Sequence, residues 1–484
     1  MPYLVTIGLE VHCQVKTRTK MFCACRTSFG DEPNTHTCPV CLGLPGALPV
    51  LNEAAIEQTL LSGLMLGCAS PEISKWDRKS YFYPDMPKNF QTTQFDLPLC
   101  IGGGVPLYAH CYPGDARKVA AGADKVVRLN RIHLEEDVAK STHLGSSSLI
   151  DFNRAGTPLM EIVSEPDLES GEEAYAYLRS LQMILIQGGV SDADMEKGQL
   201  RCDVNISLRR RPEEPLGPKV ELKNLNSISA IRRAIHFEIE RQGEDLSQGR
   251  AQVQSTRRWD DERGETQLMR TKEDAHDYRY FACPDLLPIR TAPLLERVRP
   301  RVPELPHELA LRFERDLGVT PYDAAVLSSD GKLATLFECL AKSSSHPKKT
   351  ANFIINTYLG TLNHRGLTIE NSPIPAEEIQ KIADSTLSES LSSSQAREII
   401  FDLIDTPGMT FETAVTTRGY GSGSAGELEA LVDQVIAENP SEVGLIKAGN
   451  LKLLNFLTGK VMKAATSKPN PKQVTDLLNA RLSG

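Results

Sequence analysis

The 484-residue sequence has no hydrophobic run long enough to span a lipid bilayer. Its longest apolar stretch, Leu60–Ala69, is interrupted by Ser62 and Gly63, whereas a membrane-spanning helix needs about 20 apolar residues. No secretory signal precedes Ile7, and the number of cysteines, 11, is odd. These features predict a protein of the reducing cytoplasm that is not attached to a membrane.

The sequence also lacks an excess of positive charge. A net charge of −9 argues against a protein that coats nucleic acid nonspecifically. The segment Gly444–Gly484 is an exception, because it holds seven basic residues and one acidic residue, a net charge of +6. Such a segment is typical of an RNA or phosphate contact, and equally of a solvated helix surface.

A phosphate-binding P-loop is absent. The Gly- and Ser-rich stretch Gly419–Gly426 superficially resembles a phosphate cradle or the serine loop of amidases. It lacks the Lys-Ser/Thr ending of a P-loop and follows no predicted strand. We interpret it as a flexible link.

The length predicts roughly three domains, and the hydrophobic content of 40% is ordinary for a globular protein. Residues 1–295 contain short alternating runs rich in Gly and Pro, which predict a β-rich domain with a few helices. Residues 296–410 have helical spacing, and residues 411–484 form a basic helical tail. The predicted fold class is therefore α+β.

Two closely spaced thiol pairs lie near the N-terminus: Cys23 with Cys25, and Cys38 with Cys41. This arrangement is typical of a tetrahedral zinc site with four thiolate ligands. Buried free cysteines or a disulfide are the alternatives. His36 could replace one thiol, but four thiolates already fill a tetrahedron and leave no open position, so the zinc would be structural.

The segment Ile7–Val15 alternates apolar and polar residues and predicts a strand. Glu10, His12 and Gln14 then share one face. A carboxylate and an imidazole two residues apart could bind a metal or transfer a proton, although a solvent-facing stripe would have the same pattern.

The segment Arg131–Asp137 packs one cation, one imidazole and three carboxylates into seven residues. On a strand, His133 and Glu135 would share one face and Glu136 would lie on the other. Adjacent carboxylates repel each other unless a cation or water intervenes. Mg²⁺, which takes one or two protein carboxylates plus phosphate oxygens, suits this cluster; an exposed acidic turn is the alternative.

Polar residues of two further kinds could surround a phosphate. Lys79 and Lys88 lie in a segment dense in Lys, Tyr, Asp and Pro, which predicts either a phosphate-binding loop or a rigid turn. Two acid–amide pairs, each with a neighbouring arginine, could form the floor of a metal and phosphate site. They are Asp151/Asn153 with Arg154, and Asp203/Asn205 with Arg201.

Three local structures can be predicted from spacing. Ser227 is a suitable N-cap for a helix whose isoleucines, from Ile228 to Ile239, lie on one face. The stretch Gln254–Arg270 predicts a hairpin that turns at Arg263-Gly264. Gly318 is a suitable C-cap for a helix, and Asn470-Pro471 is a suitable start for the last one.

Taken together, these stretches resemble the B-type subunits of the bacterial aspartyl/glutamyl-tRNA amidotransferases, and the resemblance spans essentially the whole chain. The matching motifs are IGLEVH, CPVCLGLPGALPVLN, DRKSYFYPDMPKNFQ, RIHLEED, NRAGTPLMEIVSEPD, LRCDVNISLR, ELKNLNS, DYRYF and KVMKA. Cys283 departs from the family pattern, in which a Pro-Glu-Pro run is usual.

The resemblance implies an enzyme that converts glutamate or aspartate, carried on a mischarged tRNA, into the amide. This chain would phosphorylate the side-chain carboxylate with ATP, and ammonia would then displace phosphate. Ammonia would come from a separate amidase (glutaminase) chain, with a third, small subunit completing a heterotrimer. No amidase Ser-Ser-Lys signature occurs in this sequence, so the glutaminase must be another chain.

The resemblance also implies roles for individual residues. The expected Mg²⁺ ligands are Glu10, His12 and Glu136; Glu136 is preferred to Glu135 as the second carboxylate of the family motif. Lys79 and Lys88 would contact phosphate or line the ammonia route. The nucleotide pocket would take Arg154, Arg201, Asp203 and Asn205, and the structural zinc would take Cys23, Cys25, Cys38 and Cys41.

The implied architecture is a β-rich, cradle-like catalytic domain, a helical connector and a small helical tail that contacts tRNA through Lys460, Lys463 and Lys468. Two other functions fit parts of the sequence. A noncatalytic zinc-ribbon RNA-binding adaptor would explain the thiols and the basic tail, but not the Glu10, His12 and Glu136 set. An ATP-dependent ligase acting on a small metabolite would not need the basic tail.

Overall fold

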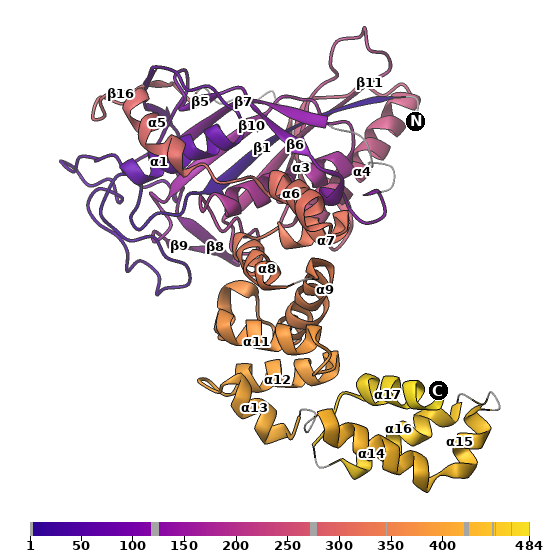
Figure 1. Cartoon of the computed structure of the whole chain (residues 1–484). Coiled ribbons are helices and arrows are strands. Elements are labelled where there is room, and N and C mark those ends of the chain that lie inside the picture. Colours follow the sequence, from indigo (N-terminus) through magenta and orange to yellow (C-terminus); the bar gives the residue numbers. More distant parts are fainter. Residues whose placement is uncertain are drawn as a thin grey trace. The chain divides into compact units, whose positions relative to one another are not determined.

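The chain divides into two compact units, Met1–Leu305 and Pro306–Gly484, shown in a computed structural model (Figure 1). The first unit is mixed α/β and the second is helical, which confirms a sheet-bearing N-terminal part followed by a helical C-terminal part. The structure describes residues 3–117, 125–271, 278–344, 346–420, 425–447, 450, 452–465 and 467–483.

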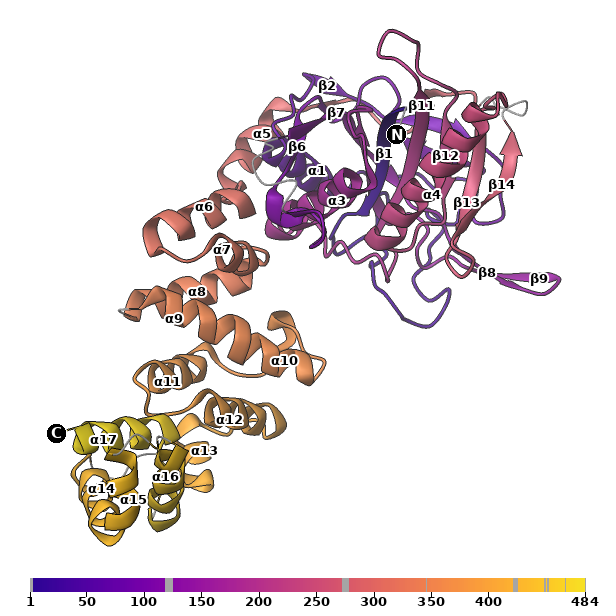
Figure 2. The same cartoon turned by 90° about the vertical axis from the view of Figure 1, so that its right-hand side faces the viewer.

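The first unit is built on a nine-stranded sheet with the order β14-β13-β12-β11-β1-β10-β7-β5, to which β6 is added beside β7 (Figure 2). The strands are β1 Leu4–Gln14, β5 Cys100–Ile101, β6 Gly104–Leu107, β7 Lys125–Glu136, β10 Pro158–Ser164, β11 Leu200–Arg209, β12 Val220–Lys223, β13 Ser255–Asp260 and β14 Glu265–Thr271. All neighbouring pairs are antiparallel except β12 with β13.

The central strand β1 is a strand of alternating character, as predicted. Leu9, Val11 and Cys13 are buried because one face of the sheet packs against the helices α1 (Glu53–Met65), α3 (Gly171–Gln187) and α4 (Ile228–Ser247) in a single apolar core. Residues two apart on a strand share a face. The intervening polar residues of β1 and of its neighbours therefore gather on the opposite face.

Helix α4 begins as predicted, because the Ser227 side chain accepts a hydrogen bond from the backbone N–H of Ala230 at 3.0 Å. Its Ile231, Ile235 and Ile239 are buried against the sheet. The predicted hairpin is also confirmed: β13 and β14 pair antiparallel, and Gly264, in the turn, has φ +66°. A left-handed backbone of this kind favours glycine.

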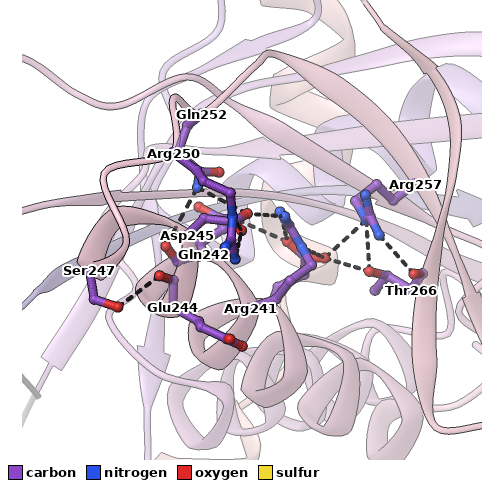
Figure 3. Close-up of polar contacts among 10 residues, drawn as sticks. Arg241, Gln242, Glu244, Asp245, Ser247, Arg250, Gln252, Arg257 and Thr266 are labelled. Atoms are coloured by element: carbon purple, nitrogen blue, oxygen red, sulfur yellow. Dashed lines mark hydrogen bonds and ion pairs between the residues drawn. The ribbon is translucent and has the colours of Figure 1, made fainter.

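A buried ion network ties α4 to this hairpin (Figure 3). Glu238 has no exposed surface and accepts hydrogen bonds from Arg241 at 2.9 and 2.8 Å and from Gln242 at 3.0 Å. Arg257 of β13 lies 3.2 Å from the same carboxylate and donates to Thr266 of β14 at 2.8 Å. The carboxylate is thereby fully compensated, which a buried charge requires.

A second, three-stranded sheet lies beside the first. It has the order β15-β3-β4, formed by Phe281–Ala282, Asp77–Ser80 and Phe90–Thr93. Its β4 contacts β7, because Gln91 Nε2 donates to the Glu136 carbonyl oxygen at 2.9 Å. This contact brings the lysine- and tyrosine-rich segment to the end of β7.

The second unit contains two separate apolar cores, one from Leu309 to Ala414 and one from Leu428 to Leu478. Its α-helices are α6 Pro306–Leu317, α7 Pro321–Leu327, α8 Gly331–Ser343, α9 Pro347–Asn352, α10 Gly360–His364, α11 Ala376–Leu387, α12 Ser393–Asp405, α13 Phe411–Arg418, α14 Ala425–Glu438, α15 Pro440–Lys447, α16 Lys452–Ala464 and α17 Pro471–Ser483.

Two predicted helix boundaries in this unit are confirmed. Gly318, with φ +63°, follows the end of α6, and α17 begins at Pro471. Two cores are compatible with a connector and a tail, but the division at 295 and 410 stays a prediction. Residues 421–424 of the expected link lie outside the described part of the chain. No helix in the described ranges is long and apolar enough to cross a membrane.

Candidate active site and metal-binding sites

The polar face of the large sheet brings together residues from four neighbouring strands, β11, β1, β10 and β7. His12 of β1 lies opposite Glu161 of β10 and Arg201 of β11. Glu161 in turn lies opposite His133 of β7. The antiparallel register alone therefore places two imidazoles on either side of one carboxylate.

One set of possible metal ligands on this face is His12, Glu135 and Glu161, here called the His12–Glu135–Glu161 group. The ligand atoms of its three members lie within 4.8 Å of one another. His12 Nε2 is 3.5 Å from Glu161 Oε2 and 4.0 Å from Glu135 Oε1. Two carboxylates and one imidazole suit a divalent cation such as Mg²⁺ or Mn²⁺, with positions left for water and phosphate oxygens.

Burial and charge perturb the pKa values in this group. Burial, with the negative charge of Glu161, raises the pKa of Glu135. Burial alone would also raise the pKa of Glu161, but hydrogen bonds from His12 and His133 hold it well below its ordinary value. Burial would lower the pKa of His12, but contact with Glu161 raises it overall. A bound cation would relieve the repulsion between the two carboxylates.

Glu136 does not join this group. Its carboxylate forms an ion pair with Lys88 and accepts the backbone N–H of Thr92 at 2.9 Å. Successive side chains on a strand point to opposite faces. Glu135 contacts His12 and the side chain of Thr93 of β4, whereas Glu136 contacts Lys88 and the backbone of Thr92. The expected ligand set of Glu10, His12 and Glu136 is therefore not brought together, and Glu135 takes the position next to His12.

Glu10 belongs to a second acidic group with Asp203 and Glu221, whose ligand atoms also lie within 4.8 Å of one another. A lysine offsets part of its negative charge, because Lys223 Nζ is 2.5 Å from Asp203 and 3.0 Å from Glu221. Asn205 Nδ2 donates to Glu10 Oε1 at 2.9 Å. Asp203 and Asn205 thus lie on the polar face, as predicted, but contact Lys223 and Glu10.

The two arginines of the expected nucleotide pocket differ in how accessible their side chains are to a ligand. Arg201, whose side chain is 37% exposed, donates to the buried Asp137 at 2.9 Å and opposes His12. Arg154 donates to the backbone carbonyls of Val138 and Ala139 at 2.9 and 2.8 Å. Arg201 can reach a ligand on the polar face, whereas Arg154 is engaged in holding the chain after β7.

Lys79 extends from β3 towards the same group. Its Nζ lies 4.9 Å from the centroid of the Tyr278 ring, a cation–π contact. Burial would lower the pKa of Lys79, but the negative charges of Glu135 and Glu161 help to raise it overall. Lys79 therefore stays charged beside the His12–Glu135–Glu161 group. Lys88, in contrast, is paired with Glu136.

The four thiols of the N-terminal loop converge as the spacing predicted. The Sγ atoms of Cys23, Cys25, Cys38 and Cys41 lie within 4.8 Å of one another. A tetrahedral zinc ion with Zn–S bonds of about 2.3 Å would set them ~3.8 Å apart, so the donor set fits zinc. All 11 cysteines lie in the described ranges, and none forms a disulfide.

A buried lysine supports this loop. Lys20 has no exposed surface, and its Nζ lies 2.7 Å from the His36 carbonyl oxygen and 3.6 Å from Cys41 Sγ. A hydrogen bond from the Cys23 thiol, joined by the charge of Lys20, lowers the pKa of Cys41. The His36 imidazole contacts Asp31 at 2.6 Å, so it is held away from a ligand role by that carboxylate.

The pair Asp151 and Asn153 holds the same loop. Asp151 accepts the backbone N–H of Asn34 at 3.0 Å, and Asn153 accepts that of His36 at 2.8 Å. The pair was expected to form part of the phosphate-site floor. It lies instead at the end of the hairpin strand β9 (Ser147–Asp151) and in the following turn, where its oxygens satisfy loop backbone donors.

Lys460, Lys463 and Lys468 in the tail are all exposed. Lys460 hydrogen-bonds to Asn439, and Lys468 lies 5.7 Å from the Tyr420 ring centroid. Exposure leaves all three accessible to a polyanion.

The comparisons with known proteins cover the whole chain. A family described as "GatB/GatE catalytic domain" matches residues 5–295, and a second, described as "GatB domain", matches residues 335–482. The chain belongs to the GatB family, the B-type subunits of the aspartyl/glutamyl-tRNA(Asn/Gln) amidotransferases.

Curated members of the family are similar over their full length. The family member from Persephonella marina is 47% identical over 485 residues, covering 100% of both chains. The one from Methylacidiphilum infernorum is 48% identical over 485 residues, covering 100% of this chain and 99% of the relative. The one from Carboxydothermus hydrogenoformans is 44% identical and covers 99% of each chain.

Sequence reasoning missed Glu161, Glu221, Lys223 and Asp137 as members of the polar face. Glu161 lies within a recognised motif, and its signal was alternation: in Pro158–Ser164 it is the one charged residue, with apolar neighbours on either side. An unpaired carboxylate at such a position predicts a partner on an adjacent strand. The partner itself could not be chosen without the strand order.

Proposed function

We propose that this chain is the carboxylate-activating subunit of a tRNA-dependent amidotransferase. Its substrates would be Glu-tRNA(Gln), Asp-tRNA(Asn) or both, together with ATP and ammonia. The observation that carries the proposal is the His12–Glu135–Glu161 group on the polar face of a chain that is 47% identical, end to end, to a relative named for this amidotransferase.

The first step would be phosphoryl transfer. A side-chain carboxylate oxygen attacks the γ-phosphorus of ATP, the bond to the leaving oxygen of ADP breaks, and an acyl phosphate forms. His12, Glu135 and Glu161 would hold a divalent cation, which when bound offsets the charge of phosphate oxygens. Lys79 and Arg201 would add two fixed positive charges around the transferred group.

The second step would be amidation. Ammonia attacks the acyl carbon, inorganic phosphate leaves, and the nitrogen loses a proton, which gives the amide on the tRNA. A carboxylate is a poor electrophile, so activation as the acyl phosphate is what makes this step possible at neutral pH. Lys79 and Lys88, on β3 and just before β4, are proposed to lie along the route by which ammonia arrives.

Partner subunits, the basic tail and the zinc site would have supporting roles. Ammonia would be supplied by an amidase (glutaminase) partner, with a third, small subunit completing a heterotrimer in the cytoplasm. The exposed Lys460, Lys463 and Lys468 would contact tRNA. Zinc at the four thiols would be structural, because four thiolates leave no coordination position for a substrate.

The test is ADP formation by the chain assembled with its amidase partner, with Glu-charged tRNA and with uncharged tRNA. We expect ADP formation that requires the charged form and is lost in His12→Ala, while tRNA binding is retained. His143→Ala changes an exposed histidine of β8 (Lys140–Leu144) and is the matched control.

Equal ADP formation with charged and uncharged tRNA would contradict the proposal. Retained tRNA binding without any ADP formation would favour a noncatalytic zinc-ribbon RNA-binding adaptor. ADP formation that is stimulated by a small carboxylic acid, but not by charged tRNA, would favour a metabolite ligase.

A further inference from the structure

Two exposed aromatic rings stack on each other beside the His12–Glu135–Glu161 group. The rings of Phe95 and Tyr280 are 4.4 Å apart at their centroids with an interplanar angle of 16°. Phe95 is 59% exposed and Tyr280 is 36% exposed. These exposed fractions leave part of the surface of each ring accessible, and aromatic surface of this kind can stack with a third ring.

Backbone hydrogen bonds and strand pairing fix the chain segments that carry both rings. The Phe95 backbone N–H donates to the buried Asp77 at 3.0 Å. Phe281, next to Tyr280, pairs with Arg78 of β3, and the Ser80 backbone N–H donates to the Tyr278 carbonyl oxygen at 2.9 Å. The stack is therefore built on the sheet β15-β3-β4 rather than on a free loop.

The backbone between Tyr278 and Tyr280 adopts an energetically unfavourable conformation. Arg279 has φ +46°, in the left-handed region that disfavours residues other than glycine by about 1 kcal/mol or more. The Tyr278 and Tyr280 rings meet edge to face at 6.2 Å and 71°. Such strain persists where packing fixes it, and it is common at ligand-binding sites.

Contacts link the aromatic stack, Lys79 and the His12–Glu135–Glu161 group in space. Thr93, two residues before Phe95, donates to Glu135 at 3.1 Å. Lys79 lies against the Tyr278 ring, and the charges of Glu135 and Glu161 together with both tyrosines act on its pKa. The order of aromatic surface, cation and metal ligands matches the order of base, phosphates and metal in a bound nucleoside triphosphate.

We propose that the Phe95–Tyr280 pair is the stacking platform for the adenine base of ATP, with Lys79 directed at its phosphates. This assignment rests on the proposed function. The terminal adenosine of the charged tRNA carries the same base, but it has no polyphosphate for Lys79 to contact, so ATP fits the whole arrangement better. A base stacks on aromatic side chains through its π-face, which every base has.

The experiment measures ATP binding to the assembled complex without charged tRNA, so it does not depend on turnover. Loss of one stacking ring should weaken binding by roughly 5- to 100-fold. We expect this for Phe95→Leu and Tyr280→Leu, whereas Tyr280→Phe, which keeps the ring, should bind ATP as the unchanged protein does. Tyr322→Leu, an exposed tyrosine of the second unit, is the matched control.

Magnesium tripolyphosphate, which has no base, is the control ligand. Its binding distinguishes a loss of base stacking from general damage to the site. Its affinity should be the same in all variants. Equal losses for ATP and tripolyphosphate would overturn the platform, as would ATP affinity within twofold of the unchanged protein in both leucine variants. A rise confined to the KM for charged tRNA, or loss of partner assembly with ATP binding intact, would also overturn it.

A second experiment labels the unchanged protein with 2-azido-ATP. Because no substitution is needed, misfolding of a variant cannot affect the result. We expect labelled peptides that contain Phe95 or Tyr280. Labels only elsewhere in the chain would overturn the proposal. If ATP binds on the platform but charged tRNA stimulates no ADP formation, the proposed function fails while the platform stands.

Discussion

His12 and Glu161 face each other across β1 and β10, with Nε2 of the imidazole 3.5 Å from Oε2 of the carboxylate. Glu135 lies beside them, and Glu136, its neighbour in sequence, is paired with Lys88. Two adjacent glutamates therefore have different partners, and the effect of this difference can be measured.

Glu135→Gln and Glu161→Gln should each reduce charged-tRNA-dependent ADP formation by at least about 100-fold, because each removes a proposed ligand of the cation that offsets phosphate charge. Titration with Mn²⁺, followed by its paramagnetic resonance, should show weakened binding in both. Glu136→Gln is the matched control and should retain Mn²⁺ affinity. Loss of Mn²⁺ binding in Glu136→Gln alone would favour Glu136 as the ligand.

Lys88→Met should lower the free energy of unfolding of the first unit by about 3 kcal/mol, because it leaves the buried Glu136 carboxylate without its cation. Trp76 and Trp259, the only two tryptophans, are both buried in this unit, so urea unfolding can be followed by their fluorescence. The double variant Lys88→Met/Glu136→Gln should recover much of the loss. An unchanged midpoint in Lys88→Met would show that the ion pair contributes little.

Chelation of zinc should destabilise the N-terminal loop without removing the chemistry. We expect the chelated complex to unfold at a lower temperature and to keep ADP formation at room temperature, since the four thiols form a site separate from His12. Cys41→Ser should behave like the chelated protein. Complete loss of ADP formation, with an unchanged far-ultraviolet circular dichroism spectrum, would contradict a purely structural zinc.

Glu238→Gln should destabilise the first unit by about 3 kcal/mol at pH 7, since it leaves the network around Arg241 and Arg257 without its anion. Burial alone would raise the pKa of Glu238, but hydrogen bonds from Arg241 and Thr266 lower it overall. A lowered pKa stabilises the fold above the unfolded value of about 4.3, and this contribution is lost as pH falls through the folded value.

The difference in unfolding free energy between the unchanged protein and Glu238→Gln should therefore shrink as the pH falls below about 4. Glu240→Gln, on the exposed side of the same helix, should change stability by less than about 0.5 kcal/mol. A difference that does not depend on pH would mean that loss of packing, and not loss of charge, causes the effect.

Lys463→Glu should weaken tRNA binding by the complex and make binding less sensitive to salt, because phosphate contacts release counterions when they form. Reversal of one exposed charge should raise the Kd for tRNA several-fold at about 0.1 M salt. Lys342→Glu, an exposed lysine of α8, is the control for a general change in charge. Equal weakening by both variants would argue against a specific contact in the tail.

The family, the central strand β1, helix α4, the β13–β14 hairpin and the convergence of the four thiols all followed from the sequence. Each depends on neighbours within one segment: a period of two or 3.6, a cap, a turn residue, or paired thiols on one loop. Periodicity also predicted that Glu135 and Glu136 lie on opposite faces of their strand, and in the structure they have different partners, His12 and Lys88.

The sequence alone could not predict which residues come into contact at the site. Whether His12 meets Glu161 or Glu136, and whether Glu10 faces a metal or Lys223, depends on which strands lie on either side of β1 and in what register. Strands β10 and β11 are about 150 and 190 residues away along the chain. Local periodicity fixes which residues share a face, but only the packing of distant strands decides which of them come into contact.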